Sequence, residues 1–390
     1  MLQALEGSQA LAKAVALCRP QVVAAYPITP QTHIVENIAK LVADGEFRCE
    51  LVSVESEFSA ASVALGAAAA GSRAYTASAS QGILLMSEVL FNIAGLRVPM
   101  VLTCANRAVS GPLSIWNDQQ DSMAVRDSGW IQLYCGDNQE AVDTTIQAYR
   151  IAERTEVPVM VCVDGFVLTH TLEPIDMPEQ SLVDQYLPPY AFSRALNPAQ
   201  PISIGTLVSP DFFTEARHSH HAAMIKALAE IESADTDWQE VSGRGWGGLF
   251  EVQGPEDADT ALLTLGSTAG TLADGLAQIP GGDRVKVIRL RCFRPFPVEA
   301  LQRACAGLKR IGVIERALSP GQGGIVATEL RDALEELDNP PKVHGFAAGL
   351  GGRDIPLTIA AEALRRMDSG EATRFAIIDV ELDKLPPEDR

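Results

Sequence analysis

The feature that most constrains the fold is an alternation of short apolar runs with helical patterns along the first 165 residues. The runs are apolar on both faces, as strands are when helices cover both sides of their sheet. This pattern predicts a doubly wound α/β domain with a mainly parallel sheet. We expect strands at residues 22–26, 50–54, 74–79, 98–105, 130–135 and 157–164, with helices at 31–42, 57–70, 83–94 and 139–153.

The same alternation restarts near residue 260, after a stretch rich in proline and glycine. In that stretch we expect a long crossing arm with a helix over residues 212–233. Two doubly wound α/β domains are therefore predicted: a first domain at 1–240, a linker at 241–258, and a smaller second domain at 259–390. Expected strands of the second domain are 261–265, 285–291, 311–315 and 343–347, and expected helices are 298–308, 324–337 and 358–367.

Charge and cysteine content exclude several classes of protein. The 31 basic and 50 acidic residues give a net charge of −19, which disfavours binding to nucleic acids or anionic membranes. No run of about 18 residues is free of charge and no basic segment opens the chain, so we expect neither a membrane-spanning helix nor a signal peptide. The closest of the seven cysteines, Cys292 and Cys305, are too far apart for a CxxC site. We therefore expect no metal or iron–sulfur site on this chain and a cytoplasmic location.

Three segments follow expected strands, at the edge of the sheet where ligands of open α/β folds bind. The first is Tyr-Pro-Ile-Thr-Pro at residues 26–30. The two prolines stiffen the chain and hold Thr29 in an extended conformation, so that its hydroxyl could meet a carboxylate or carbonyl. The alternative is that Pro30 begins a helix and Thr29 caps it, and the residues alone favour this alternative.

The second segment is Glu-Ser-Glu at residues 55–57, ahead of a helix made mostly of small apolar residues. The Glu57 carboxyl, surrounded by the apolar residues of that helix, would suit a proton donor or relay. Alternatively, Glu57 only complements the helix dipole in the first turn. Glu55 is expected to be an ordinary exposed acid.

The third segment, Asn-Arg-Ala at residues 106–108, precedes a long loop that ends near Gln120. The guanidinium of Arg107 could bind a carboxylate with two hydrogen bonds, or it could pair with Asp118 or Asp121 to hold the loop. Between these segments, Gln81 and Gly82 open another helix and could meet a ligand. A histidine cluster at 218–221 is expected on a solvated helix face, and the Gly-rich turn at 319–324 is expected to be structural.

Together these segments resemble the α subunit of the 2-oxoacid:ferredoxin oxidoreductases, closest to the pyruvate enzyme. The matching stretches are AAYPITPQTHIVENIA, VESEFSAASVALGAAAAG, TASASQGILLMSEVL, ANRAVSGPLSIWNDQQDSMAVRDSGWIQLY and VDGFVLTH. RCFRPFP and GLGGRDI in the second half also fit this family. The resemblance implies a pyrimidine-binding-type thiamine diphosphate domain followed by a transketolase C-terminal-like domain.

The family implies an enzyme that converts a 2-oxoacid, CoA and oxidised ferredoxin to acyl-CoA, CO2 and reduced ferredoxin. Its cofactor-activating glutamate falls on Glu57, and its substrate-binding threonine and arginine fall on Thr29 and Arg107. Cofactor contacts are implied for Glu57, Thr29, Gln81 and Gly82. Thiamine diphosphate would be shared with a β subunit, while Mg²⁺ and [4Fe-4S] clusters would belong to partner subunits of β, γ and δ type. Electrons would leave to ferredoxin through the complex.

The substrate side chain stays open at this point. Within the family the alternatives to pyruvate are 2-oxoglutarate, a branched-chain or aryl 2-oxoacid, and oxalate. Arginine is sparse between residues 50 and 125 and lysine is absent there, which favours a small or apolar side chain. Outside the family's reaction, the alternatives are a non-catalytic scaffold subunit and a thiamine enzyme that needs no ferredoxin.

Overall fold

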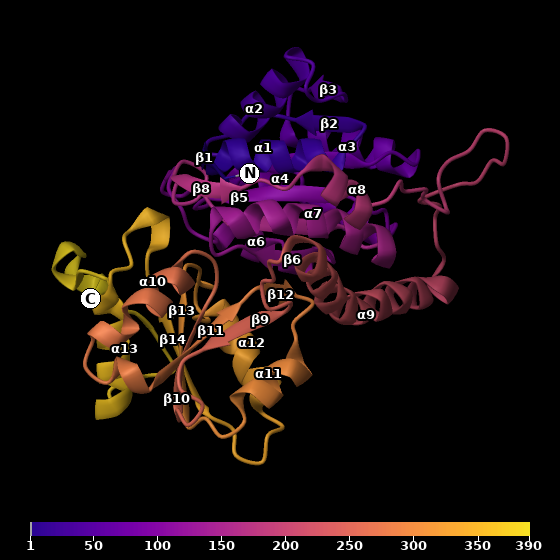
Figure 1. Cartoon of the computed structure of the whole chain (residues 1–390). Coiled ribbons are helices and arrows are strands. Elements are labelled where there is room, and N and C mark those ends of the chain that lie inside the picture. The colour runs from indigo at the N-terminus through magenta and orange to yellow at the C-terminus, as the bar shows by residue number, and fades with distance from the viewer. Residues whose placement is uncertain (1) are drawn as a thin grey trace. The chain divides into compact units, whose positions relative to one another are not determined.

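The computed structural model describes residues 2–390, which form two compact units. Unit 1 comprises the described residues up to 251 together with 290–297, and unit 2 comprises residues 252–289 and 298–390. Each unit is built on its own sheet with helices packed against it (Figure 1). The predicted α/β class with two parallel-sheet domains is confirmed. Within the described chain, no helix is both long and apolar enough to cross a membrane.

The sheet of unit 1 has seven strands in the order β12-β6-β7-β5-β4-β2-β3. All neighbouring strands from β3 to β6 run parallel, and β12 pairs antiparallel with β6 at the edge. The strands are β2 (Val22–Ala25), β3 (Glu50–Ser53), β4 (Ala74–Ser78), β5 (Val101–Asn106), β6 (Ile131–Tyr134), β7 (Val159–Asp164) and β12 (Cys292–Arg294). Strands β4 to β7 are buried throughout, which explains why their sequences are apolar on both faces.

Helices connect these strands, and their bounds differ in part from those expected. The expected helix at 83–94 is two helices that meet at Met86, and the first of them already begins at Ser80. The helix expected at 212–233 is longer and runs over 33 residues. The helices are α1 (Gly7–Cys18), α2 (Thr32–Ala43), α3 (Glu57–Ala69), α4 (Ser80–Leu85), α5 (Ser87–Gly95), α6 (Gln120–Ala124), α7 (Asn138–Thr155), α8 (Gln180–Tyr186) and α9 (Pro210–Ser242).

Several elements of unit 1 were not predicted from the sequence. A two-stranded antiparallel sheet joins β1 (Leu2–Glu6) to β8 (Leu172–Asp176). Where a long crossing arm was expected, an extended loop, drawn between α8 and α9 in Figure 1, links these two helices. His220 on α9 also differs from the prediction of a solvated face. It is buried, and its Nε2 lies 3.1 Å from the carbonyl oxygen of Gly129, where the missing side chain of the glycine makes room for the ring.

Unit 2 has a six-stranded sheet in the order β15-β14-β13-β10-β11-β9, in which β10, β11, β13, β14 and β15 pair in parallel. Its core includes Leu262, Ile314 and Phe346, each fully buried. The strands are β9 (Phe250–Gln253), β10 (Thr260–Thr264), β11 (Val285–Leu290), β13 (Arg310–Glu315), β14 (Lys342–Ala347) and β15 (Phe375–Ile377); the helices are α10 (Thr268–Gly275), α11 (Val298–Cys305), α12 (Ile325–Leu334) and α13 (Leu357–Ser369).

The Gly-rich turn at 319–324 lets a buried carboxylate cap α12. Glu315 accepts hydrogen bonds from the backbone N–H groups of Val326 at 2.8 Å and Ala327 at 3.2 Å. A side chain at Gly324 would overlap Glu315, because an added Cβ would lie 2.1 Å from Oε1. Burial raises the pKa of Glu315 to about 7, although these backbone N–H groups act in the opposite direction.

This raised pKa predicts a pH-dependent stability of unit 2. The folded chain binds the Glu315 proton more tightly than the unfolded chain, so the stabilising contribution is full below about pH 4.5 and is lost as pH rises towards 7. The loss is about 3 kcal/mol of unfolding free energy. Because Trp116, Trp130, Trp238 and Trp246 all lie in unit 1, unfolding of unit 2 should be followed by circular dichroism rather than tryptophan fluorescence.

The control is Glu315→Gln, which removes the titrating group. The unfolding free energy of the wild type minus that of the variant should fall as pH rises from 5 to 7, because only the wild type loses stability over this range. A difference that stays constant over this range would contradict the assignment, whatever its size.

Candidate functional site

The candidate site lies where β2, β3, β4 and β5 of unit 1 end. Pairing places Ser78 at the end of β4 beside Cys104, and Ala25 at the end of β2 beside Ser53 of β3. Because parallel strands end at the same edge of a sheet, the turns that follow them come together. These turns carry Thr29, Glu57, Gln81, Gly82 and Arg107, the five residues singled out from the sequence.

Glu57 is buried in the first turn of α3, where its exposed fraction is 7%. The residue before it, Ser56, caps the helix by accepting a hydrogen bond from the N–H of Ser59 at 3.2 Å. The backbone of Gly82 in α4 lies directly against the Glu57 side chain. A Cβ at Gly82 would lie 2.7 Å from Glu57 Oε1 and 2.3 Å from Ser78 Oγ, so only glycine fits without a shift. The structure thus brings Glu57, Gly82 and Ser78 together.

The turn between β4 and α4 is held in a strained conformation. Ser80 has a φ of +50°, which is uncommon for a residue with a side chain. Its hydroxyl donates to the carbonyl oxygen of Ala108, and the side-chain amide of Gln81 lies within hydrogen-bond reach of the same hydroxyl. Strain of this kind persists where surrounding contacts over-determine the backbone, and it is common at functional sites. Gln81 is half-buried beside this turn.

Thr29 and Arg107 contact each other through the Thr29 backbone. Nη1 of Arg107 donates to the Thr29 carbonyl oxygen at 2.8 Å, and Nε donates to the Ser114 carbonyl oxygen at 3.0 Å. The Thr29 side chain is exposed. Helix α2 begins at Thr32 with Gln31 as its N-cap residue, so the alternative that Thr29 caps this helix is wrong.

The guanidinium of Arg107 is anchored but still has hydrogen-bond donors to spare. Among residues 2–390, its two hydrogen bonds use two of five N–H groups, which leaves three for a ligand. Partial burial lowers the pKa of Arg107, and the nearby Asp121 acts in the opposite direction. The alternative that Arg107 pairs through its side chain with Asp121 does not describe this geometry, because Asp121 accepts from the Arg107 backbone N–H instead, at 2.9 Å. Asp118, the other residue of that alternative, accepts from the backbone N–H of Gln120 at 3.0 Å.

A row of four rings was not predicted from the sequence. Trp116 packs at a tilt against Phe166, with 4.6 Å between ring centroids, Phe166 against His170 at 4.6 Å, and His170 against His33 at 4.4 Å. Nδ1 of His33 also lies 2.9 Å from Glu6 Oε1. Ligand atoms of Glu6, His33 and His170 all lie within 4.8 Å of one another. The ring contacts and the His33–Glu6 pair account for this grouping, and we assign no metal to it.

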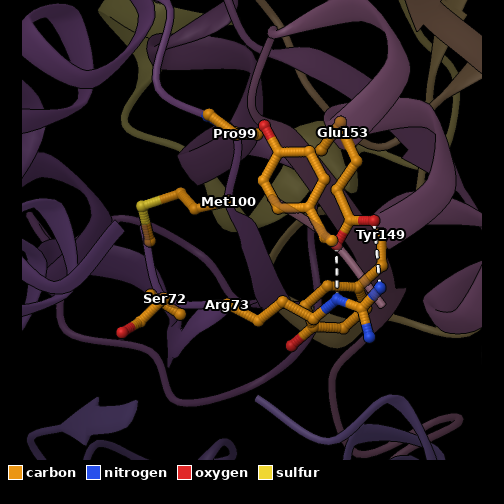
Figure 2. Close-up of a pocket in the computed structure, with 9 residues that line it drawn as sticks. Ser72, Arg73, Pro99, Met100, Tyr149 and Glu153 are labelled. Atoms are coloured by element: carbon orange, nitrogen blue, oxygen red, sulfur yellow. Dashed lines mark hydrogen bonds and ion pairs between the residues drawn. The ribbon is translucent and has the colours of Figure 1, made fainter. Parts of the chain in front are cut away.

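A pocket at the opposite edge of the sheet is filled by an ion pair (Figure 2). It lies at the start of β4, and its lining includes Met100, Tyr149 and the pair Arg73–Glu153. Nε of Arg73 lies 2.5 Å from Glu153 Oε1, and both side chains are largely buried. This pocket is therefore part of the packing of β4 against α7 rather than an extension of the candidate site.

Comparison with known families assigns the two halves of the chain separately. Residues 13–235 match the family described as "Pyruvate flavodoxin/ferredoxin oxidoreductase, thiamine diP-bdg". Residues 258–358 match "Pyruvate:ferredoxin oxidoreductase core domain II". The first match alone covers more than half of the chain and includes all five residues of the candidate site.

Curated relatives cover nearly the whole chain. "Pyruvate synthase subunit PorA" of Methanosarcina barkeri is 46% identical over 92% of this chain and 91% of the relative. The protein of the same name from Methanothermobacter thermautotrophicus is 43% identical over 95% and 96%. "Ketoisovalerate oxidoreductase subunit VorA" of Pyrococcus horikoshii is 39% identical over 94% and 95%.

Solved structures show the same fold at lower identity. A 2-oxoglutarate:ferredoxin oxidoreductase from Magnetococcus marinus, with 2-oxoglutarate, coenzyme A and succinyl-CoA bound, superimposes with a TM-score of 0.68 at 22% identity. The match covers 94% of this chain and 65% of that one. A split-gene transketolase, described as an inactive β4 tetramer, matches with a TM-score of 0.53 at 14% identity over 93% and 98% of the two chains.

Proposed function

The chain belongs to the pyruvate flavodoxin/ferredoxin oxidoreductase family, and on that premise we propose that it is the α subunit of a thiamine-diphosphate-dependent enzyme that oxidatively decarboxylates pyruvate. The reaction converts pyruvate, CoA and oxidised ferredoxin to acetyl-CoA, CO2 and reduced ferredoxin. One observation carries the proposal: two pairs of residues lie at the same edge of the sheet. In one pair the buried Glu57 contacts Gly82, and in the other Arg107 donates to the carbonyl oxygen of Thr29.

The residues around Glu57 fit the aminopyrimidine part of thiamine diphosphate. Glu57 and Ser78 are buried side by side next to Gly82, and the Ser78 hydroxyl has no hydrogen-bond partner among the described residues. A carboxyl and a spare hydroxyl suit the ring and exocyclic nitrogens of an aminopyrimidine. When bound, thiamine diphosphate supplies the electron sink for decarboxylation. Glu57 would hold a proton at a pyrimidine nitrogen, and Gly82 would allow the close approach.

Arg107 would bind the substrate carboxylate, with Thr29 beside it. The remaining N–H groups of Arg107 suit a planar carboxylate. The hydrogen bonds to the carbonyl oxygens of Thr29 and Ser114 fix the orientation of the guanidinium group. The exposed Thr29 side chain would offer its hydroxyl to the oxygen atoms of the 2-oxoacid. The aromatic row that starts at Trp116 would help to exclude water on this side.

A small substrate side chain is supported by where the other arginines lie. Between residues 50 and 125 the only further cations are Arg73 and Arg97. Arg73 is bound to Glu153 in the pocket of Figure 2, and Arg97 donates to the carbonyls of Thr155 and Glu156. Neither supplies the second cation that the distal carboxylate of 2-oxoglutarate would need. Pyruvate therefore fits better, as the relatives named pyruvate synthase subunits also suggest.

We further propose that the chain works inside a hetero-oligomer of β, γ and δ-type partner subunits. The β subunit would complete the thiamine diphosphate site and hold Mg²⁺, and [4Fe-4S] clusters on partner subunits would pass electrons to ferredoxin. Exposed apolar side chains on the arm and at the start of α9 support an assembly, among them Ile202, Leu207 and Phe212. All seven cysteines are free thiols, which supports a reducing, cytoplasmic location.

The test is an assay of the complex isolated through a tag on this chain under anaerobic conditions. We expect a brown complex that reduces a viologen dye in the presence of CoA and a 2-oxoacid. In a panel of pyruvate, 2-oxoisovalerate, 2-oxoglutarate and oxalate, kcat/KM should be highest for pyruvate. A colourless complex, or one that turns over 2-oxoglutarate best, would contradict the proposal.

A further inference from the structure

A buried carboxylate without a role in the proposed chemistry joins the two parts of the site. Asp121 lies in the first turn of α6 with no exposed surface. Its Oδ2 accepts from the backbone N–H of Ser80 at 2.8 Å and from that of Arg107 at 2.9 Å. Its Oδ1 accepts from Asn106 Nδ2 at 2.8 Å and from the Ser122 N–H at 2.8 Å.

One oxygen atom therefore ties together two turns that are far apart in sequence. Ser80 is the strained residue two positions before Gly82, whose backbone contacts Glu57. Arg107 is the residue anchored to Thr29. The second oxygen is fixed by Asn106 and Ser122, so the carboxylate cannot rotate away without losing buried hydrogen bonds. Such losses are costly because the donors would stay unpaired in the interior.

We propose that Asp121 is a positioning residue that sets the Glu57–Gly82 part of the site relative to the Thr29–Arg107 part. The inference rests on the proposed function for what the site binds, but the tethering of the two turns does not depend on it. Asp121 touches neither substrate nor cofactor in this proposal and acts only through the backbone of Ser80 and Arg107.

The variant that tests this role is Asp121→Asn in the full complex. Asparagine has the same shape, but its NH2 group would face two N–H donors in place of an accepting oxygen. The matched control is Asp118→Asn in the same loop, since Asp118 accepts a local hydrogen bond from the Gln120 N–H at 3.0 Å. Both variants should give the wild-type subunit composition and iron content.

The first readout is hydrogen exchange followed by mass spectrometry, which needs no activity. In Asp121→Asn, amides in peptides covering residues 79–82 and 106–109 should exchange about tenfold faster or more, while those of β5 at 101–104 keep their protection. Asp118→Asn should leave both peptides unchanged. Unchanged exchange at Ser80 and Arg107 in Asp121→Asn would overturn the proposal. So would a general loss of protection, because it would show that Asp121 only stabilises the fold.

The second readout separates KM from kcat. A misplaced Arg107 should raise KM for pyruvate about tenfold, with a smaller change in kcat per active site, whereas a purely structural role would lower the active fraction and leave KM unchanged. Faster exchange without a change in KM would also overturn the positioning role. If the wild-type complex turned over no 2-oxoacid, the proposed function would fail, and the exchange measurement alone would decide whether Asp121 tethers the two turns.

Discussion

Replacing Glu57 by glutamine should lower kcat for pyruvate by about 100-fold or more, the range that general acid–base groups contribute. Glutamine keeps the size and one oxygen of the side chain, so the contact with Gly82 is preserved. What it loses is the ability to give and take a proton at the pyrimidine ring. KM for pyruvate should change little, because Arg107 and Thr29 are intact. The measurement is steady-state dye reduction by the complex, normalised to bound thiamine diphosphate.

The matched control is Glu55→Gln, two residues earlier. Glu55 is exposed, and its carboxylate accepts from the hydroxyl of Ser59 at the surface. Glu55→Gln should retain kcat within about twofold, as surface changes away from a site do. Equal kcat in wild type and Glu57→Gln would mean that Glu57 only occupies the first turn of α3, as its helix-dipole alternative holds. Such a result would also favour the alternative that the chain is a non-catalytic scaffold subunit.

The sequence predicts the parallel sheet of unit 1 because its strands are buried on both faces. Strands β4, β5 and β7 read as nearly continuous apolar runs, and the expected bounds agree with the structure within a few residues. The edge strand of this sheet is harder to predict from the sequence. Strand β12 belongs to unit 1 although it follows β11 in the chain, because its residues extend the sheet at β6.

A buried arginine shows why this edge could not be predicted. Arg291 donates to Glu140 at 3.1 Å, to Gln147 at 2.7 Å and to the carbonyl of Gly248 at 2.8 Å. A single charged residue at the end of an apolar run carries no sign that its side-chain partners, Glu140 and Gln147, lie 151 and 144 positions earlier. Its interactions are long-range and polar, whereas periodicity reports only local patterns of burial.

The candidate site shows the same limit. Glu57, Thr29 and Arg107 stand out because each follows a predicted strand, and such positions are meaningful in an open α/β sheet. Asp121 lies 14 residues after Arg107, beyond an irregular loop, and its bond to the backbone of Ser80 spans 41 residues. The sequence suggested Asp121 as a partner for the Arg107 side chain. A carboxylate that binds backbone N–H groups has no sequence signature, since every non-proline residue offers that donor.

Replacing Arg107 by lysine should lower kcat/KM for pyruvate about 100-fold, mainly through a higher KM. Lysine keeps the charge, but it has no planar fork with which to hold the carbonyls of Thr29 and Ser114 and a carboxylate at the same time. Losing charge-assisted hydrogen bonds to the substrate costs about 2–3 kcal/mol, which corresponds to this factor. The measurement is initial-rate kinetics on pyruvate and on its neutral methyl ester.

The ester separates carboxylate binding from general damage to the site. If Arg107 binds the carboxylate, the wild type should prefer pyruvate strongly and Arg107→Lys should lose most of that preference. The matched control is Arg97→Lys, because Arg97 also donates to two backbone carbonyls, at 2.7 and 3.4 Å, but at the opposite edge of the sheet. An equal loss on both substrates would mean that Arg107 only holds its loop against Thr29. The carboxylate would then need another partner, and the choice of pyruvate over a neutral ketone would rest on Thr29 alone.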